Sequence, residues 1–182
     1  MFGDTYSQFG DKSLFMGFFN RNGTEKDQNF VPKERYEPEY LPEPSDVLEG
    51  YQVLTGEEHT GLHSVIRGIF EERKVYDMTF NYNLARLNLD TRHPRAGLRY
   101  AEKDENTVLI EFTPTTEFCP QAETLAKAVF VSTNDLSEKH GYELVEVRVR
   151  NHEKSVAINR LLTEKLDRYR KEGSIKELET LD

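Results

Sequence analysis

The stretch Thr107-Val-Leu-Ile-Glu-Phe-Thr113-Pro-Thr-Thr-Glu-Phe-Cys119-Pro120 decides the fold, because two kinds of periodicity meet in it. Residues 107–113 are rich in Val, Ile and Phe, which predicts a strand. Pro120 suits the first turn of a helix, where its missing N–H costs nothing. The residues that follow predict a helix with one buried face, marked by Ala122, Leu125, Ala126, Val129, Phe130, Thr133 and Leu136. Cys119 therefore stands between a strand and a helix.

Elements on both sides of this stretch complete an α+β pattern. Residues 62–70 carry apolar side chains at helical spacing. A strand beginning near Leu98 joins the one at 107–113 through a hairpin turn at 104–106. Residues 142–150 alternate apolar and charged side chains, which predicts a strand with one solvated face. We therefore expect a two-layer domain with helices packed on a small mixed or antiparallel sheet.

Glycines and polar residues mark the helix ends. Gly141 is expected to end the helix that follows Pro120. Ser155 is expected to cap a last helix, which Gly173 ends. The inward side chains of that helix are predicted to be Ile158, Leu161, Leu162, Leu166 and Tyr169.

The first third of the chain differs from the rest. Four of the seven prolines fall between Val31 and Ser45, in a stretch rich in Glu and Tyr, and the first twenty residues are rich in Phe. Such a composition favours extended chain with little core. We predict that residues 1–60 form a largely irregular N-terminal extension and that residues 61–182 form the domain.

Charge and cysteine content exclude several classes of function. The net charge of −9 argues against nucleic-acid binding, whose affinity comes largely from Lys and Arg on phosphates. A single cysteine permits no intrachain disulfide, which predicts a reducing, cytoplasmic location. No apolar run approaches the roughly 20 residues that span a bilayer, so no membrane partner is expected.

Cys119 is the candidate for chemistry. A thiol before a helix N-terminus feels the positive end of the helix dipole, which favours the nucleophilic and metal-binding thiolate. The hydroxyl groups of Thr115 and Thr116 are expected to reach the sulfur, and the thiol to be accessible. The alternative is a buried structural cysteine, because free Cys is among the most buried residue types.

The stretch from Leu109 to Pro120 resembles the core motif of the SufT and PaaD-like metal–sulfur cluster assembly family, an apolar strand followed by Thr-Pro-Thr, two variable residues and a cysteine. Residues 150–152 and 157–168 resemble the C-terminal pattern of that family. The matching positions there are Asn159, Leu162, Lys165 and Arg168. The similarity covers roughly residues 62–170.

This resemblance implies an iron–sulfur cluster assembly or targeting factor, not an enzyme, in which Cys119 handles a transient cluster. The implied partners are iron–sulfur carriers and recipient apoproteins, with a homodimer as an option, since a cluster usually takes four thiolates. The family's Asp-Pro-Glu motif is matched only at Asp77, because Met78 and Thr79 replace Pro and Glu. The acidic partner of Cys119 could be Asp77 or Glu117.

Two other functions stay open. Cys119 could be the nucleophile of an enzyme with His152 or His140 as the base, or it could be inert in a purely structural adaptor. His59 and His63 stand four residues apart, a spacing that on a helix can chelate zinc. The sequence offers no third ligand, so a solvated helix start is the simpler interpretation of these two histidines.

Overall fold

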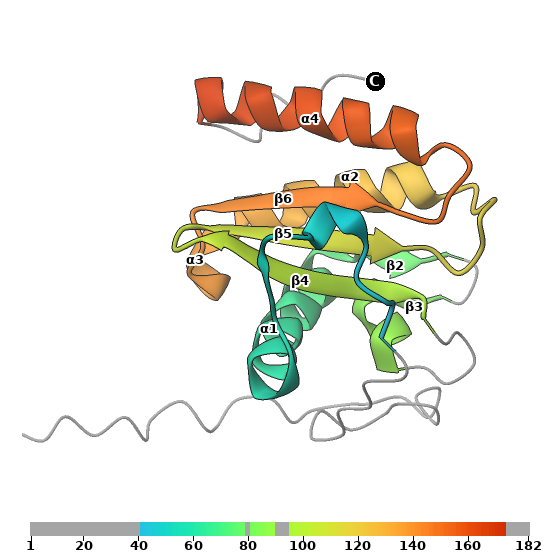
Figure 1. Cartoon of the computed structure of the whole chain (residues 1–182), viewed down its shortest axis with the longest axis horizontal. Helices are drawn as coiled ribbons and strands as arrows, with labels where there is room; N and C mark the ends of the chain where they lie inside the picture. The colour runs from blue at the N-terminus through green and yellow to red at the C-terminus, as the bar shows by residue number, and fades with distance from the viewer. Residues whose placement is uncertain (1–40, 79–80, 90–94, 174–182) are drawn as a thin grey trace, which may run out of the picture.

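Long helices and a mixed sheet dominate the described part of the chain, which in this computed structural model comprises residues 41–78, 81–89 and 95–173 (Figure 1). The elements follow in the order η2 (Asp46–Leu48), β1 (Gln52–Val53), α1 (Gly56–Arg73), β2 (Tyr76–Asp77), β3 (Tyr82–Asn83), η3 (Leu84–Leu89), β4 (Gly97–Asp104), β5 (Thr107–Thr113), α2 (Ala122–Asp135), α3 (Ser137–His140), β6 (Leu144–Val149) and α4 (Ser155–Glu172). The fold class is α+β, as predicted.

A mixed sheet of order β1-β4-β5-β6 forms the centre of the domain. β4 and β5 are antiparallel and are joined by a tight turn, in which the Asn106 N–H donates to Asp104 Oδ1 at 2.9 Å. β6 returns parallel to β5, with Val108 opposite Val145 and Phe112 opposite Val149. Because β5 and β6 are parallel, the loops that follow them leave from the same end of the sheet.

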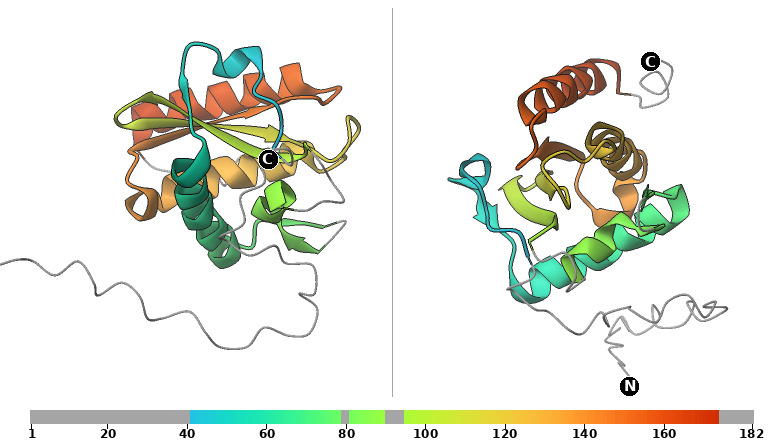
Figure 2. Two further views of the ribbon diagram at one scale, coloured as in Figure 1. Left: turned by 60° about the horizontal axis from the view of Figure 1, so that its bottom comes forward. Right: turned by 90° about the vertical axis from the view of Figure 1, so that its right-hand side faces the viewer.

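The helices α1 and α2 cover one face of this sheet, and α4 runs along its β6 edge (Figures 1 and 2). The alternation of each strand puts its large apolar side chains on the covered face, where they are almost fully buried. The sheet contributes Leu98, Tyr100, Val108, Ile110, Phe112, Val145, Val147 and Val149 to this core. No helix in the described ranges is long and apolar enough to cross a bilayer.

The second face of the sheet is covered by the segment that precedes α1. Leu48 of η2 packs on Ala101 and Leu109, and β1 pairs with β4 along its edge. The domain boundary predicted at residue 60 therefore falls inside α1, and residues 41–55 pack on the domain. The sequence does not reveal this packing, because η2 and β1 are too short to show a period of apolar side chains. Residues 1–40 lie outside the described residues.

The face of β6 expected to be solvated holds an ion-pair cluster instead. Glu146 is only 4% exposed, and its carboxylate lies 3.0 Å from Lys103 Nζ and 2.9 Å from Arg170 Nη2. Glu111, on the neighbouring strand, pairs with Arg150 and accepts a hydrogen bond from the Ser45 hydroxyl. Burial raises the pKa of Glu111, and these two partners partly offset that rise.

Two asparagine side chains close the outer edge of β6. Asn134 of α2 donates to the Val145 carbonyl and accepts from its N–H, both at 2.9 Å. Asn159 of α4 does the same for Val149, at 2.9 and 2.7 Å. Each amide thus supplies the two hydrogen bonds that a further strand would supply.

Two helix ends differ from the expectation, and a third agrees with it. α2 ends at Asp135, and Gly141 ends the separate turn α3 in the left-handed conformation, with φ of 81°. Ser155 is the first residue of α4 rather than its cap, and no side chain caps this helix. Gly173 does end α4, as predicted, with φ of 65°.

Candidate functional site

The loops that follow β5 and β6 meet at one end of the sheet and carry the predicted site. The Glu153 N–H of the second loop donates to the Glu117 carbonyl of the first at 2.9 Å. β2 reaches the same end, where the Met78 N–H donates to Gln121 Oε1 at 3.1 Å. Three segments far apart in the sequence are therefore tied together around Cys119. We call this region the Cys119 end.

Cys119 itself is buried, with 8% of its surface exposed, and packs with the main core. Its N–H donates to the Thr116 carbonyl at 3.3 Å, and its own carbonyl accepts from the Ala122 N–H at 3.2 Å. The expectation of an accessible thiol is wrong, because the loop turns Cys119 inward three residues before α2 begins.

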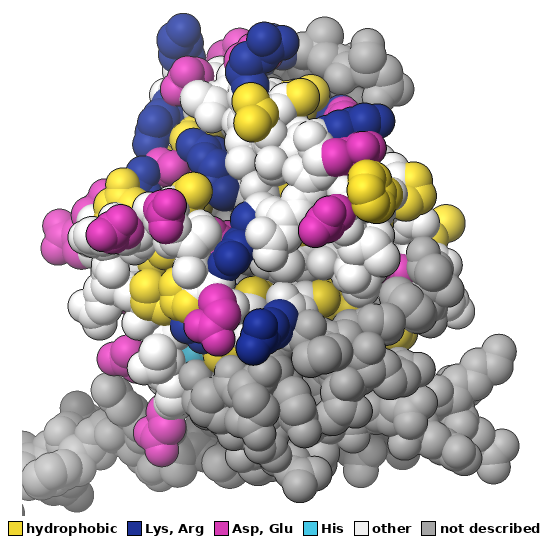
Figure 3. Space-filling model, turned by 45° about the vertical axis from the view of Figure 1, so that its right-hand side comes forward, with side chains coloured by type: hydrophobic (Ala, Val, Ile, Leu, Met, Phe, Trp, Pro, Cys, Tyr) yellow, Lys and Arg dark blue, Asp and Glu magenta, His cyan; other side chains and the backbone are white. Residues whose placement is uncertain are grey.

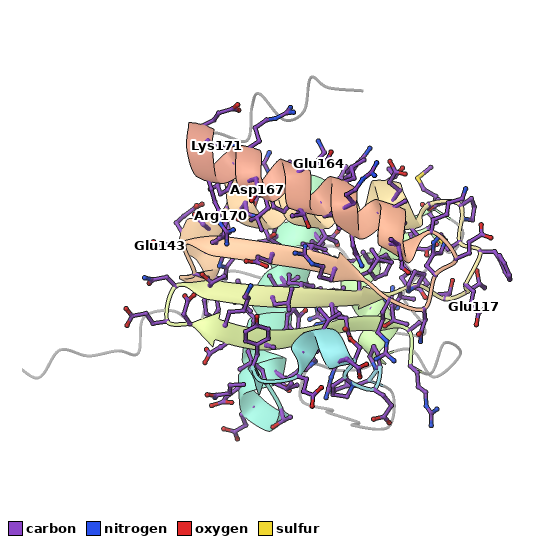
Figure 4. The ribbon with its side chains drawn as sticks, turned by 45° about the horizontal axis from the view of Figure 1, so that its top comes forward. Glu117, Glu143, Glu164, Asp167, Arg170 and Lys171 are labelled. Atoms are coloured by element: carbon purple, nitrogen blue, oxygen red, sulfur yellow. The ribbon has the colours of Figure 1, made fainter. Side chains whose placement is uncertain are left out.

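The other residues predicted around the sulfur are held differently. Thr115 is half-buried and Thr116 is exposed, and in the described part of the chain neither hydroxyl makes a hydrogen bond to Cys119. Thr116 holds the loop through its backbone carbonyl instead. Figure 4 places Glu117 at the outer end of the molecule, and this side chain is exposed. Asp77 is buried at the end of β2, one residue before Met78, whose N–H binds Gln121 at the start of α2.

His152 lies next to Cys119, but both of its ring nitrogens are occupied by the backbone. Nε2 is 3.0 Å from the Cys119 carbonyl oxygen, and Nδ1 accepts from the Lys154 N–H at 3.1 Å. Since Nδ1 accepts, Nε2 carries the proton and donates it to the carbonyl. His152 therefore fastens the two loops together and has no lone pair to offer to the thiol.

His140, the other candidate base, is held in the same way. Its Nε2 lies 2.9 Å from the Thr133 carbonyl oxygen, and its Nδ1 accepts from the Tyr142 N–H at 3.2 Å. It stands where α3 meets β6, at the end of the sheet where β5 and β6 begin. The predicted combination of a cysteine nucleophile with a histidine base is therefore not assembled.

The residues of α4 that were expected to support the site do not converge on it. Asn159 binds the backbone of Val149 and so belongs to the closure of the sheet. Lys165 is half-buried and Arg168 is exposed, both further along the same helix. The spacing of Asn159, Lys165 and Arg168 follows from the helix itself, since α4 has one face toward β6 and the other toward solvent.

His59 and His63 are buried on α1 rather than solvated. Their rings stack with centroids 5.4 Å apart, and both lie against the ring of Tyr100. His63 Nδ1 is 2.7 Å from the Tyr100 hydroxyl, and Nε2 is 2.7 Å from the Ala85 carbonyl oxygen. Burial lowers the pKa of His63 to about 4 and that of His59 to about 3, so both rings are neutral at pH 7.

A zinc site at these histidines is not formed, since both nitrogens of His63 already have protein partners. Throughout residues 41–78, 81–89 and 95–173, no group of three or more His, Cys, Asp or Glu side chains is placed to hold a metal ion. The two histidines instead help to pack α1 against β4, through the ring of Tyr100.

Sequence reasoning missed two features of this architecture. Asn134 is one of the buried residues of α2, and a polar amide among apolar neighbours is a signal that it has a buried backbone partner. The exposed apolar side chains of Met78, Phe118 and Val156 gave no signal, because a single apolar residue in a loop or first turn is ordinary.

Comparison with known proteins gives one match. A family model described as "Domain of unknown function (DUF7998)" matches residues 28–176, whereas no curated protein and no solved structure matches the chain. The resemblance to the SufT and PaaD-like family is therefore wrong, because nothing in the matched family connects it to iron–sulfur assembly. Short motif matches are hypotheses with a risk of false positives, and the Thr-Pro-Thr segment before Cys119 is such a match. The chain belongs to the DUF7998 family of domains of unknown function.

Proposed function

We propose that this chain is a protein-binding adaptor that docks a partner on the Cys119 end. The observation that carries the proposal is an apolar rim of three large side chains, exposed by 76% at Met78, 68% at Phe118 and 83% at Val156. Aromatic residues and Met are enriched where proteins bind one another. Figure 3 shows this end of the molecule, where hydrophobic side chains reach the surface between charged ones.

The rim is prearranged, which favours binding over random exposure. Met78 directly follows β2, Phe118 lies in the loop after β5, and Val156 lies in the first turn of α4, so the three come from segments far apart in the chain. The hydrogen bonds from Met78 to Gln121 and from Glu153 to Glu117 hold these segments together. A surface fixed before binding loses less conformational entropy when a partner docks.

The surroundings of Cys119 favour an adaptor over a cysteine-dependent enzyme. Both ring nitrogens of His152 and of His140 are hydrogen-bonded to backbone groups, so neither ring can accept the thiol proton without breaking a hydrogen bond. The thiol also lies beneath the surface rather than on it. A nucleophile needs a base within reach and access to its substrate.

A second candidate is handover of an iron–sulfur cluster during the maturation of other proteins. One observation favours it: the single thiol of the chain lies within the same end of the domain that carries the apolar rim. A docked carrier or recipient protein, or a second copy of this chain, would supply the remaining thiolates, since a cluster usually takes four. We further propose a cytoplasmic location, because one cysteine leaves no intrachain disulfide to form.

Site-specific photo-crosslinking tests the adaptor role. A photoreactive benzoylphenylalanine replaces Phe118 in one variant and the exposed Arg160 of α4 in the control variant. We expect a discrete crosslinked product from position 118 alone. The purified partner should then bind the variant Phe118→Ser with a Kd at least tenfold weaker than wild type, as for a central apolar contact of about 1.4 kcal/mol. Equal products from both positions would refute the docking surface.

Anaerobic reconstitution separates the two candidates. Wild-type protein and the variant Cys119→Ala are each incubated with iron and sulfide, then mixed with an apo-acceptor. Visible absorbance and cluster transfer that depend on Cys119 would favour handover. Identical behaviour of the two proteins, together with retained partner binding, would leave the adaptor as the function.

A further inference from the structure

A hollow of about 340 Å³ opens at the opposite end of the sheet from Cys119, between α1, α3 and the start of β6. Figure 2 shows α1 and α3 beside each other there. Leu54, Leu62 and Val65 give the hollow an apolar floor, and its volume is at the lower limit of small-ligand sites. It is large enough for one long side chain rather than for a cofactor.

Two carboxylates and a tyrosine stand on its wall. Glu102 Oε1 accepts the Tyr142 hydroxyl proton over an O–O distance of 2.5 Å. Burial raises the pKa of Tyr142, and the negative charges of Glu102 and Glu58 raise it further, so both carboxylates lie close to this hydroxyl. Within the described ranges neither Glu58 nor Glu102 has an ion-pair partner.

Neither Lys139 nor His140, which also line the hollow, neutralises the charge of Glu58 and Glu102. Lys139 lines the hollow, but its Nζ pairs with Glu72, which is not part of the wall. His140 also lines it, and burial lowers the pKa of this ring, so it is neutral at pH 7. The wall therefore has two carboxylates and, among the described residues that line it, no cation left to pair with them.

We infer that this hollow binds a lysine or arginine side chain presented by a partner protein. The aliphatic stem lies on Leu54, Leu62 and Val65, as long basic side chains commonly bury their stems on apolar surface. The cationic head lies between Glu58 and Glu102, beside the ring of Tyr142. The charge of the wall selects a basic side chain over an apolar one of equal length, and the floor selects it over a bare cation. This site is separate from the apolar rim and does not depend on the adaptor role.

An NMR titration of the whole ¹⁵N-labelled protein tests the inference with two matched probes. Nα-acetyl-lysine methylamide carries the cation, and Nα-acetyl-norleucine methylamide has a side chain of nearly the same length without it. We expect the lysine probe to shift the amide signals of Gly61 and Val65 with a Kd on the order of millimolar, the affinity suited to one side chain. The norleucine probe should bind at least several-fold more weakly.

The double variant Glu58→Gln/Glu102→Gln should weaken lysine binding about tenfold, since the loss of each ion pair near the surface should weaken it about threefold. The amide oxygen introduced by Glu102→Gln can still accept the Tyr142 hydroxyl, and the dispersion of the amide spectrum reports that the fold is kept. Should the double variant lose its fold, Glu58→Gln alone, an exposed position on α1, should still weaken binding about threefold. The control Glu164→Gln, on the exposed side of α4 (Figure 4), should bind as wild type does. Equal binding of both probes, shifts that map elsewhere, or unchanged binding by the Gln variants would overturn the inference.

Discussion

Mild acid should destabilise this protein through the buried pair His59 and His63. Burial is the main cause that lowers their pKa values from 6.5 to about 3 and about 4. The unfolded chain therefore binds more protons than the folded chain between pH 6.5 and those values. The stabilisation is fully present above pH 6.5 and is lost as the pH falls toward 4 and then 3.

The loss can be worked out from one pKa unit being about 1.4 kcal/mol. A pH of 5 is roughly 1.5 units below the pKa of a histidine in the unfolded chain. Each histidine therefore lowers the unfolding free energy by on the order of 2 kcal/mol at this pH, and the pair lowers it by about 4 kcal/mol. His140, whose pKa is also lowered by burial, acts in the same direction. Glu111 has the opposite effect, because its raised pKa makes the folded state bind a proton at a higher pH than the unfolded state does.

Urea unfolding followed by circular dichroism at pH 7.5, 6 and 5 measures this loss. Wild-type protein should lose about 4 kcal/mol of unfolding free energy between pH 7.5 and 5. The variant His59→Gln should lose only about half of that, whatever its stability at pH 7.5, because one titrating ring is gone. A wild-type loss below about 1 kcal/mol, or the full loss in His59→Gln, would refute the neutral buried pair.

Two further predictions concern the closure of β6 and the thiol. Asn134→Ala leaves the N–H and C=O of Val145 without their partner, so it should lower the unfolding free energy by about 2–5 kcal/mol in a urea titration. The loss should be larger than for Asn159→Ala, because Asn159 is only half-buried whereas Asn134 is buried. A cost below about 0.5 kcal/mol for Asn134→Ala would contradict the pairing seen here. Cys119 should react with iodoacetamide far more slowly than a free thiol, and faster in urea concentrations too low to unfold the domain globally, because reaction requires local opening. Reaction of the native protein at the rate of a free thiol would show that the loop does not shield the sulfur.

The regular elements were predictable because their signals are local. Strand 107–113 has the bounds expected from its β-branched and aromatic residues, and the apolar stripe of residues 62–70 lies in α1. The alternation of residues 145–149 predicted β6 and the side of each valine. Each of these predictions needed only the period of apolar side chains within one segment.

The site was less predictable because it depends on residues distant in the sequence. Cys119 is held inward partly by His152, 33 residues later, and no spacing rule connects the two. The sequence favours a solvated helix start at His59 and His63, yet the ring of Tyr100 covers both, and the Ala85 carbonyl binds His63. Local pattern could locate the thiol between a strand and a helix but could not say whether it faced water.

The two asparagines that close β6 also set an order of events during synthesis. Asn134 precedes β6 in the chain, so it can bind the backbone of Val145 as soon as the strand forms. Asn159 is synthesised later, with α4, and only then can the backbone of Val149 be bound. A nascent or truncated chain that ends before residue 155 would present Val149 as an open strand edge, the kind of surface on which chains aggregate. Proteolytic loss of α4 should therefore be visible as aggregation of the remaining domain, not merely as lower stability.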